Sequence, residues 1–341
     1  MIAYRRGVGT CFHRLAGFFY GTAGEFHLGD KKIRRFKKIL FFADGAKGEK
    51  TALDRAHDLA TTNSAELVVV DVVADLSTND VRLNSSIKHL QDTLIKERER
   101  DLGQLIASLP GRKGKKPAIK KRVVPGKDYI EIIKMVVKEK FDLVIKSVNS
   151  KSVFTAALFG DNDIRLFHHC PCPVLILKPS RRKRMHHMLA AVDPVTEDQT
   201  GVRLNSEIME IATSLAEVEL ADLQVLHVWD LPIHEKTNSS IGKGELKTLS
   251  MLLRKDTEQK MDKLVGKYVH VPLQDHLLHG KPHKVIRKFV ADNDIDLLIM
   301  GTVARPGVPG FTVGNTAERI LNHVDCSVLA LKPRGWKSPI K

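Results

Sequence analysis

The sequence predicts two tandem α/β domains, each a doubly wound, five-stranded parallel sheet with helices on both faces. Two observations predict this fold. A long segment of the 341-residue chain recurs, and within each copy short apolar runs alternate with amphipathic segments. Continuously apolar runs are typical of parallel strands that are covered on both faces. Strands that alternate with helices indicate a doubly wound α/β domain.

An internal repeat is visible in matching segments. Three pairs of segments resemble each other: residues 38–45 and 187–194, 141–146 and 295–300, and 172–179 and 326–333. The last two pairs share an offset of 154 residues. Four further matches keep that offset: Gly126 with Gly280, Gly160 with Gly314, Arg165 with Arg319, and His169 with His323. A constant offset over so many positions indicates an internal duplication.

The duplication sets the domain boundaries. We expect the first domain at residues 35–180, the second at 185–333 and a tail at 334–341. Residues 181–184 (Arg-Arg-Lys-Arg) read as a basic, solvated linker. Residues 1–34 form a basic extension, which we expect to be disordered. Alternatively, the first start codon is not used, and the extension is absent from the mature protein. A membrane-surface segment is the alternative for the extension.

The second domain begins with four elements that its apolar pattern defines. Residues 188–192 are a short apolar run that predicts a buried strand. Apolar side chains recur at a spacing near 3.6 within residues 200–219, which predicts a helix. Residues 222–229 predict the second strand, and residues 245–265 predict a charged amphipathic helix.

The remaining elements repeat the alternation. A weak third strand is expected at residues 268–273, followed by a helix with one apolar face at 282–292. Residues 296–300 and 327–331 predict the fourth and fifth strands, with a helix at 316–323 between them. The first domain follows the same plan, with strands near residues 38–43, 66–73, 121–124, 141–146 and 173–178.

Composition limits the class of protein. With 43% hydrophobic and 28% charged residues the chain is globular rather than disordered. No run of 18 apolar residues predicts a spanning helix. Four cysteines do not make a disulfide scaffold and suggest a reducing compartment, so we expect a cytoplasmic protein. The net charge of +15 permits an anionic partner, but it says nothing of the fold.

Polar residues and glycines follow the first and fourth strands of the second domain. Ligands of open α/β sheets bind beyond the carboxyl ends of the strands, at the topological switch point. Asp193 follows the first strand there, and a loop from Gly301 to Gly314 follows the fourth. Glycine allows the backbone to approach a bound group closely. This arrangement suits a nucleotide, with the ribose or a metal ion near Asp193.

The end of that loop adds groups that suit phosphate. A helix opens there, and helix N-termini offer free N–H groups and a partial positive charge. Asn315 or Thr316 can cap this helix, and Arg305 could add charge to phosphate oxygens. The alternative is a structural role for each residue: Gly301 and Gly314 would be turn glycines, and Asp193 would only support a turn.

These residues resemble the universal stress proteins. The family's loop reads G-x2-G-x9-G-[S/T] after the fourth strand, and an Asp follows the first. Here the loop reads Gly301-x2-Ala304-x9-Gly314-Asn315, so the spacing is kept while Ala304 and Asn315 depart from the pattern. The family's backbone contact to adenine maps onto Val228. The resemblance extends over residues 35–333, twice, and implies ATP or AMP with Mg²⁺ as the ligand and no required cofactor.

The first domain has lost this loop. Ser147 stands in place of Gly301, and Ser150 in place of Ala304. Only Gly160 is retained, and Asp161 and Asp163 follow it. Two carboxylates at a phosphate cradle repel an anion. Although Asp44 survives after the first strand, we expect this degenerate site not to bind ATP as the family does.

Cysteine and histidine clusters favour ordinary structural roles. Cys170 and Cys172 form C-P-C after His168 and His169, but C-x-C alone lacks the second ligand pair of a structural zinc site. A free cysteine entering a strand is usually a small hydrophobic residue. Three histidines near Gly280 are expected at the surface: His276, His279 and His283. We therefore predict no metal site.

The motifs of common enzymes are missing from the sequence. There is no G-x-S-x-G, H-E-x-x-H or Walker A motif, and no residue stands out as a catalytic base. We therefore expect a non-enzymatic stress-response protein that binds a small ligand and protein partners. Two alternatives stay open: a nucleic-acid-associated protein, motivated by the charge of +15, and a slow ATPase. Low aromatic content, 6%, weighs against nucleic acid.

The fifth strands predict how the two domains meet. The resemblance implies that single-domain relatives dimerise through this strand. Here Val174–Leu177 and residues 328–331 could pair within one chain and form a pseudo-dimer. Such pairing would protect an edge that is otherwise open to association. A further homodimer of whole chains is also implied by the family.

Overall fold

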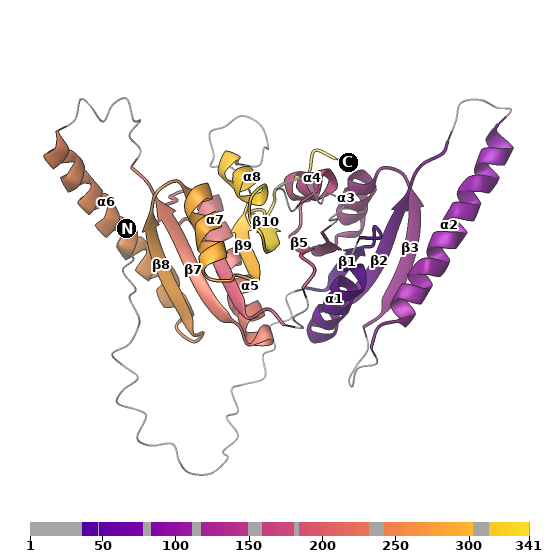
Figure 1. Ribbon diagram of the computed structural model, residues 1–341, viewed down its shortest axis with the longest axis horizontal. Coiled ribbons are helices and arrows are strands. Elements are labelled where there is room, and N and C mark those ends of the chain that lie inside the picture. The colour runs from indigo at the N-terminus through magenta and orange to yellow at the C-terminus, as the bar shows by residue number, and fades with distance from the viewer. Residues whose placement is uncertain are drawn as a thin grey trace, which may run out of the picture.

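Both domains have the alternating architecture that the sequence predicts. A computed structural model describes residues 36–46, 48–77, 83–110, 117–148, 159–180, 184–231, 242–302 and 314–340. The N-terminal extension at residues 1–34 lies outside these ranges. The expectation of two doubly wound domains with helices on both faces of the sheet is confirmed (Figure 1).

The elements follow one another in the same order in each domain. The first domain consists of β1 (Lys38–Phe42), α1 (Glu49–Asn63), β2 (Glu66–Val73), α2 (Asn84–Ala107), β3 (Ile119–Pro125), α3 (Asp128–Glu139), β4 (Leu143–Ser147), α4 (Asp161–His169) and β5 (Val174–Leu177). The second consists of β6 (His187–Ala191), α5 (Gln199–Glu219), β7 (Asp222–Trp229), α6 (Lys243–Val265), β8 (Leu273–His279), α7 (Pro282–Asp292), β9 (Leu297–Gly301), α8 (Asn315–Leu321) and β10 (Ser327–Leu331).

The prediction of a third strand at residues 268–273 of the second domain was wrong. Gly266–Tyr268 is a short 3-10 helix, and β8 begins only at Leu273. The apolar residues Tyr268 and Val271 are buried beside the end of α6 instead of forming a strand. β8 itself is polar and half-buried because it pairs with β7 on one side only. An edge strand of this kind lacks the apolar run that identifies central strands.

All ten strands form one continuous sheet. Their order is β3-β2-β1-β4-β5-β10-β9-β6-β7-β8, with every pair parallel except β5 and β10. In that central antiparallel pair, Leu175 lies opposite Leu329 and Val174 opposite Ala330. The predicted pairing of the fifth strands within one chain is therefore confirmed. Because both strands already have two neighbours, a homodimer of whole chains would need another surface.

The helices cover the sheet in two layers, and each layer continues across both domains (Figure 1). One layer contains α1, α2, α5 and α6, which contribute Leu53, Leu102, Ile208 and Met261 to a single apolar cluster. The other contains α3, α4, α7 and α8, which contribute Ile132, Leu166, Ile286 and Ile320 to a second cluster. The two domains thus share both hydrophobic cores.

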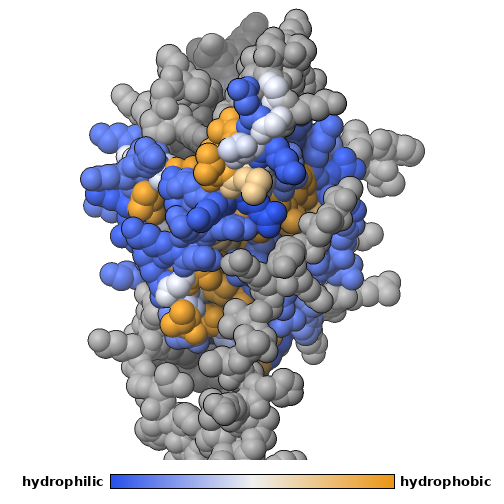
Figure 2. All heavy atoms as spheres, turned by 90° about the vertical axis from the view of Figure 1, so that its left-hand side faces the viewer, coloured by the Kyte–Doolittle hydropathy of each residue, from blue (hydrophilic) through white to orange (hydrophobic). Residues whose placement is uncertain are grey.

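The outer end of the second domain is polar. Figure 2 shows hydrophilic side chains over most of this end, with smaller hydrophobic patches between them. Three large apolar side chains of α6 are exposed to solvent: Leu249, Met251 and Leu252. In the described ranges no helix is both long and apolar enough to cross a bilayer.

Leu329 tests whether the domains unfold together. Its side chain is 1% exposed and lies in a cluster that both domains share. We expect Leu329→Ala to lower the free energy of unfolding by about 2–5 kcal/mol, in one cooperative urea transition. The matched Leu252→Ala, at a side chain that is 62% exposed, should change it by no more than about 0.5 kcal/mol. Two separate transitions, with only one of them shifted, would contradict the shared core.

Candidate functional site

The carboxyl ends of β7, β6 and β9 lie side by side in the second domain. The strand register pairs Ala191 of β6 with Leu226 of β7 and with Met300 of β9. Asp193, Val228 and Gly301 stand one or two residues beyond these partners, so the sheet brings the three predicted site residues to one edge. This is the edge at which open α/β sheets bind ligands.

Asp193 is held in place through its backbone. Its N–H donates to Asn205 Oδ1 at 3.0 Å, and its carbonyl accepts from Asn205 Nδ2 at 2.7 Å. Asn205 lies on α5 and is buried. Beside it, His227 Nδ1 lies 2.9 Å from the Val192 carbonyl oxygen. The half-buried Asp193 carboxylate therefore projects from a rigid turn.

The two ends of the predicted phosphate loop are joined at its base. Gly314 N–H donates to the Thr302 carbonyl at 3.1 Å, and Gly314 immediately precedes α8. Gly301 has a packing reason to be glycine, since a Cβ there would lie 2.6 Å from Leu204 of α5. Thr316 is exposed on α8, and Asn315 begins that helix. Ala304 and Arg305 lie outside the described residues.

The equivalent position in the first domain is filled by a buried ion cluster. Lys146 Nζ lies 2.8 Å from Asp44 Oδ2 and 2.9 Å from Asp163 Oδ1, and it donates to the Ser147 carbonyl at 2.9 Å. The Lys146 side chain is fully buried, and Asp163 is 1% exposed. Gly160 N–H also donates to Asp163, at 3.1 Å.

This cluster corrects the charge that the sequence predicted for the degenerate site. Asp161 is exposed, but Asp163 is buried against an ammonium and is not free to repel an anion. Burial lowers the pKa of Lys146, but the carboxylates of Asp163 and Asp44 outweigh it, so that pKa lies above its usual value. Lys146 therefore stays charged and occupies the space beside Asp44.

Further carboxylates surround the cluster. Asp128 accepts from Asn162 at 2.7 Å, and burial, together with Asp44, raises the pKa of Asp128. Asp71 pairs with Arg98 at 2.5 Å, while burial raises the pKa of Asp71. Asp71 and Asp128 thus each have a partner of their own beside the cluster.

The second domain has apolar residues at the corresponding repeat positions. The offset of 154 places Met300 at the position of Lys146 and Ala317 at that of Asp163. Met300 and Ala317 belong to one hydrophobic cluster. The Lys146–Asp163 pair of the first domain therefore has no counterpart at these two positions of the second, although the strands around them match.

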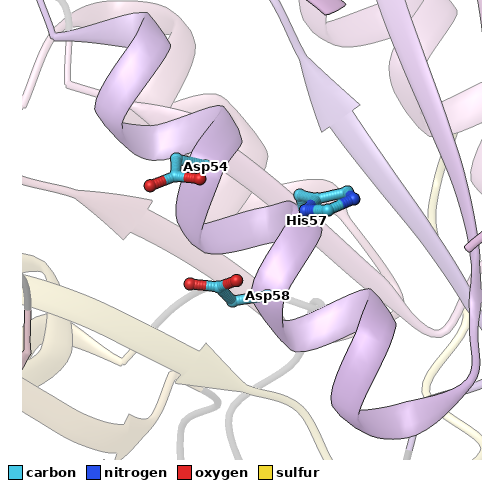
Figure 3. A group of neighbouring side chains, drawn as sticks. All are labelled: Asp54, His57 and Asp58. Atoms are coloured by element: carbon cyan, nitrogen blue, oxygen red, sulfur yellow. The ribbon is translucent and has the colours of Figure 1, made fainter. Parts of the chain in front are cut away.

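One group of side chains has the spacing of a metal site. Asp54, His57 and Asp58 lie on α1, and their candidate ligand atoms are all within 4.8 Å of one another (Figure 3). Residues three and four apart share one side of a helix, which explains the grouping. Each of the three side chains also has other interactions. This group was not predicted from the sequence, because its D-x-x-H-D pattern is also that of the polar side of an ordinary amphipathic helix.

Cys170 and Cys172 lie close together just before β5. Cys170 is buried, and its Sγ lies 3.6 Å from Cys172 Sγ. Burial raises the pKa of Cys172 well above its usual value, and a neutral thiol is a poor nucleophile. Among the other histidines, His279 is exposed, as predicted, whereas His276 is half-buried and packs against Phe289 with ring centroids 4.9 Å apart.

A pocket of about 790 Å³ lies at the opposite end of the β9 and β10 strands. Arg184, Arg287 and His323 line it, together with Asp325, which pairs with Lys178 at 2.6 Å. Because it lies at the amino ends of these strands, this pocket is separate from the predicted ligand site.

Family comparison supports the tandem arrangement. The pattern of the universal stress protein family matches residues 35–178 and again residues 185–332. The chain belongs to the universal stress protein family. The resemblance stated from the loop and the repeat is therefore confirmed for both domains of this universal stress protein.

Curated relatives of this chain include universal stress proteins E. Universal stress protein E of Photorhabdus laumondii is 24% identical over 221 residues, which cover 62% of this chain and 68% of the relative. The universal stress protein E homolog of Haemophilus influenzae is 28% identical over 197 residues, covering 57% of this chain and 62% of the relative. This chain is therefore similar to universal stress protein E.

Solved structures share the fold. A protein of unknown function from Pseudomonas aeruginosa PAO1 has a TM-score of 0.64 at 22% identity, covering 88% of this chain and 94% of that one. A universal stress protein from Archaeoglobus fulgidus has a TM-score of 0.57 at 19% identity, covering 86% and 98%. At these identities the comparison establishes the architecture of this universal stress protein only.

Lys146 tests the buried ion cluster of the first universal stress domain. In Lys146→Met, which copies the residue of the second domain, Asp44 and Asp163 lose their buried counter-charge. We expect urea denaturation at pH 7 to show a loss of about 3–5 kcal/mol. Adding Asp44→Asn and Asp163→Asn should recover most of this loss. A single variant as stable as the wild type would show that the cluster contributes nothing to the fold.

Proposed function

We propose that this universal stress protein binds an adenine nucleotide, ATP or AMP, in its second domain only, and acts without catalysis. The observation that carries the proposal is the difference between the two domains. An internal ammonium fills the first site, whereas the second domain has the apolar residues Met300 and Ala317 at the positions of Lys146 and Asp163. Because only the second domain is proposed to bind, each chain should hold one nucleotide.

The roles of individual residues follow from the family resemblance. Asp193 would contact the ribose or a Mg²⁺ ion, for which a carboxylate oxygen is a suitable ligand. The backbone of Val228 would contact adenine. Gly301, Gly314 and Asn315 would lie along the phosphates, with Thr316 and Arg305 adding a hydroxyl and a charge. The joined loop ends at Thr302 and Gly314 support this assignment.

The same edge offers little for catalysis. Phosphoryl transfer to water requires a group that orients the nucleophile. Near Asp193, the imidazole of His227 is buried against the Val192 carbonyl, which limits it as a general base. We therefore propose a role in which nucleotide occupancy changes the interaction with protein partners. Phosphate release from ATP by the wild type that is lost in Asp193→Ala would favour a slow ATPase instead.

Denaturing mass spectrometry of the natively purified protein tests the nucleotide site. The wild type should release ATP or AMP, and Gly314→Glu should release none, because a carboxylate at the loop repels phosphate. Backbone strain does not explain this loss, since Gly314 has a φ of −61°. Titration should show affinity lowered by at least about tenfold.

The repeat supplies a matched control. Gly160 occupies the same position in the first domain, and a Cβ there meets only Asp163 Oδ2, at 3.9 Å. Gly160→Glu should leave nucleotide binding unchanged. Equal loss in both variants would indicate a general structural effect, and absence of nucleotide in the wild type, with no binding on titration, would refute the proposed function.

A further inference from the structure

A group of three metal-ligating side chains lies on α1 of the first domain. Asp54, His57 and Asp58 have candidate ligand atoms that all lie within 4.8 Å of one another (Figure 3). Among the described residues, no other three His, Cys, Asp or Glu side chains approach one another so closely. The nucleotide proposal concerns the second domain and uses none of the three, so the group has no role in it.

The spacing along α1 explains why these side chains meet. Residues three and four positions apart are neighbours on a helix surface, so Asp54 is next to both His57 and Asp58. All three positions lie in the interior of a helix of 15 residues. The His57 side chain is 6% exposed, whereas Asp54 and Asp58 are half-buried. The imidazole is therefore held by packing, and the carboxylates remain accessible from solvent.

One imidazole and two carboxylates are a donor set for a divalent transition metal ion. Zn²⁺ binds His nitrogen and Asp oxygen at about 2.0–2.2 Å, so two atoms on one ion lie at most about 4.2 Å apart. Rotation of the two half-buried aspartate side chains closes the difference from 4.8 Å without a movement of α1. The two carboxylates balance the charge of the ion. The nitrogen ligand favours Zn²⁺ over Mg²⁺ and Ca²⁺, which prefer oxygen.

The repeat shows that packing does not require a histidine here. Helices α1 and α5 both end at a residue in the left-handed conformation, Ser64 and Leu220. Counting back seven residues from each places Thr213 of α5 at the position of His57. Thr213 is 5% exposed, and its hydroxyl donates to the Met209 carbonyl within the same helix at 2.9 Å. A threonine thus fills the buried position, and the histidine adds a ligand nitrogen.

We propose that Asp54, His57 and Asp58 bind one divalent transition metal ion of the zinc class. The two aspartates repel each other across one helical turn, and the ion relieves this repulsion. Because each side chain also has other interactions, the ion competes with these, and we expect micromolar rather than nanomolar affinity. The site lies beside a contact between the domains, since Arg55 of α1 pairs with Glu219 of α5 at 3.8 Å.

Calorimetric titration of the metal-free, full-length protein with ZnCl₂ tests the site. The double variant Asp54→Asn/Asp58→Asn keeps the shape of both side chains and removes both charges. We expect it to bind Zn²⁺ at least about tenfold more weakly than the wild type. Asp92→Asn is the matched control, because Asp92 and His89 are three residues apart on α2 and belong to no such group of three. It should bind Zn²⁺ as the wild type does.

Two further measurements separate ligation from a structural role. Co²⁺ in place of Zn²⁺ absorbs visible light, and its spectrum reports nitrogen ligation, so His57→Gln should change that spectrum and Asp92→Asn should not. ZnCl₂ should raise the Tm of the wild type and leave that of the double variant unchanged, because only a ligand that binds the folded protein stabilises it. If the double variant does not fold without metal, Asp58→Asn and His57→Gln take its place.

Three results would overturn the proposal. The wild type could bind no Zn²⁺, or it could bind Zn²⁺ no more tightly than the double variant, which would place the ion elsewhere. Displacement of Zn²⁺ by an equal concentration of Mg²⁺ would show that the site is not selective for a nitrogen-binding ion. None of these results bears on the nucleotide site, whose test uses ATP and Gly314→Glu.

Discussion

The antiparallel pairing of β5 with β10 is the contact on which the rest of this molecule depends. It turns two five-stranded sheets into one ten-stranded sheet and allows each helical layer to share a single apolar cluster. It also places the end of α4 beside the residue that follows β10. Lys332 thereby donates to the Phe167 carbonyl, a contact that links the two halves of the chain.

Within this shared frame, the two domains have diverged in charge rather than in backbone. Lys146 and Asp163 have taken the positions that Met300 and Ala317 hold in the second domain. Burying a charge is costly unless it is paired, and in the first domain the Lys146 ammonium lies beside two carboxylates and donates to a backbone carbonyl. The second domain keeps an apolar centre at the same positions. The same fold thus supports a charged cluster in one domain and an apolar one in the other.

Much of this could be predicted from the sequence, because the repeat and the apolar runs identify central strands directly. The strand β8 was missed because an edge strand carries polar residues, whereas the apolar Tyr268 and Val271 serve helix packing. Lys146 was missed because it reads as the end of an apolar run, while its partners Asp44 and Asp163 come from distant segments. Lys332 looks the same as Lys178 in sequence. Only the fold shows that one is buried and the other is not.

Covalent fusion of the two domains has a consequence for how such proteins can change. In a symmetric dimer of identical subunits, every substitution appears twice, so a lysine that fills one site fills both and abolishes binding altogether. Joining the copies in one chain removes this restriction while the paired fifth strands keep the dimer-like arrangement. One half can then be devoted to stability and the other to recognition. The buried cluster around Lys146 is a change of this kind, present in one half of the chain and absent from the other.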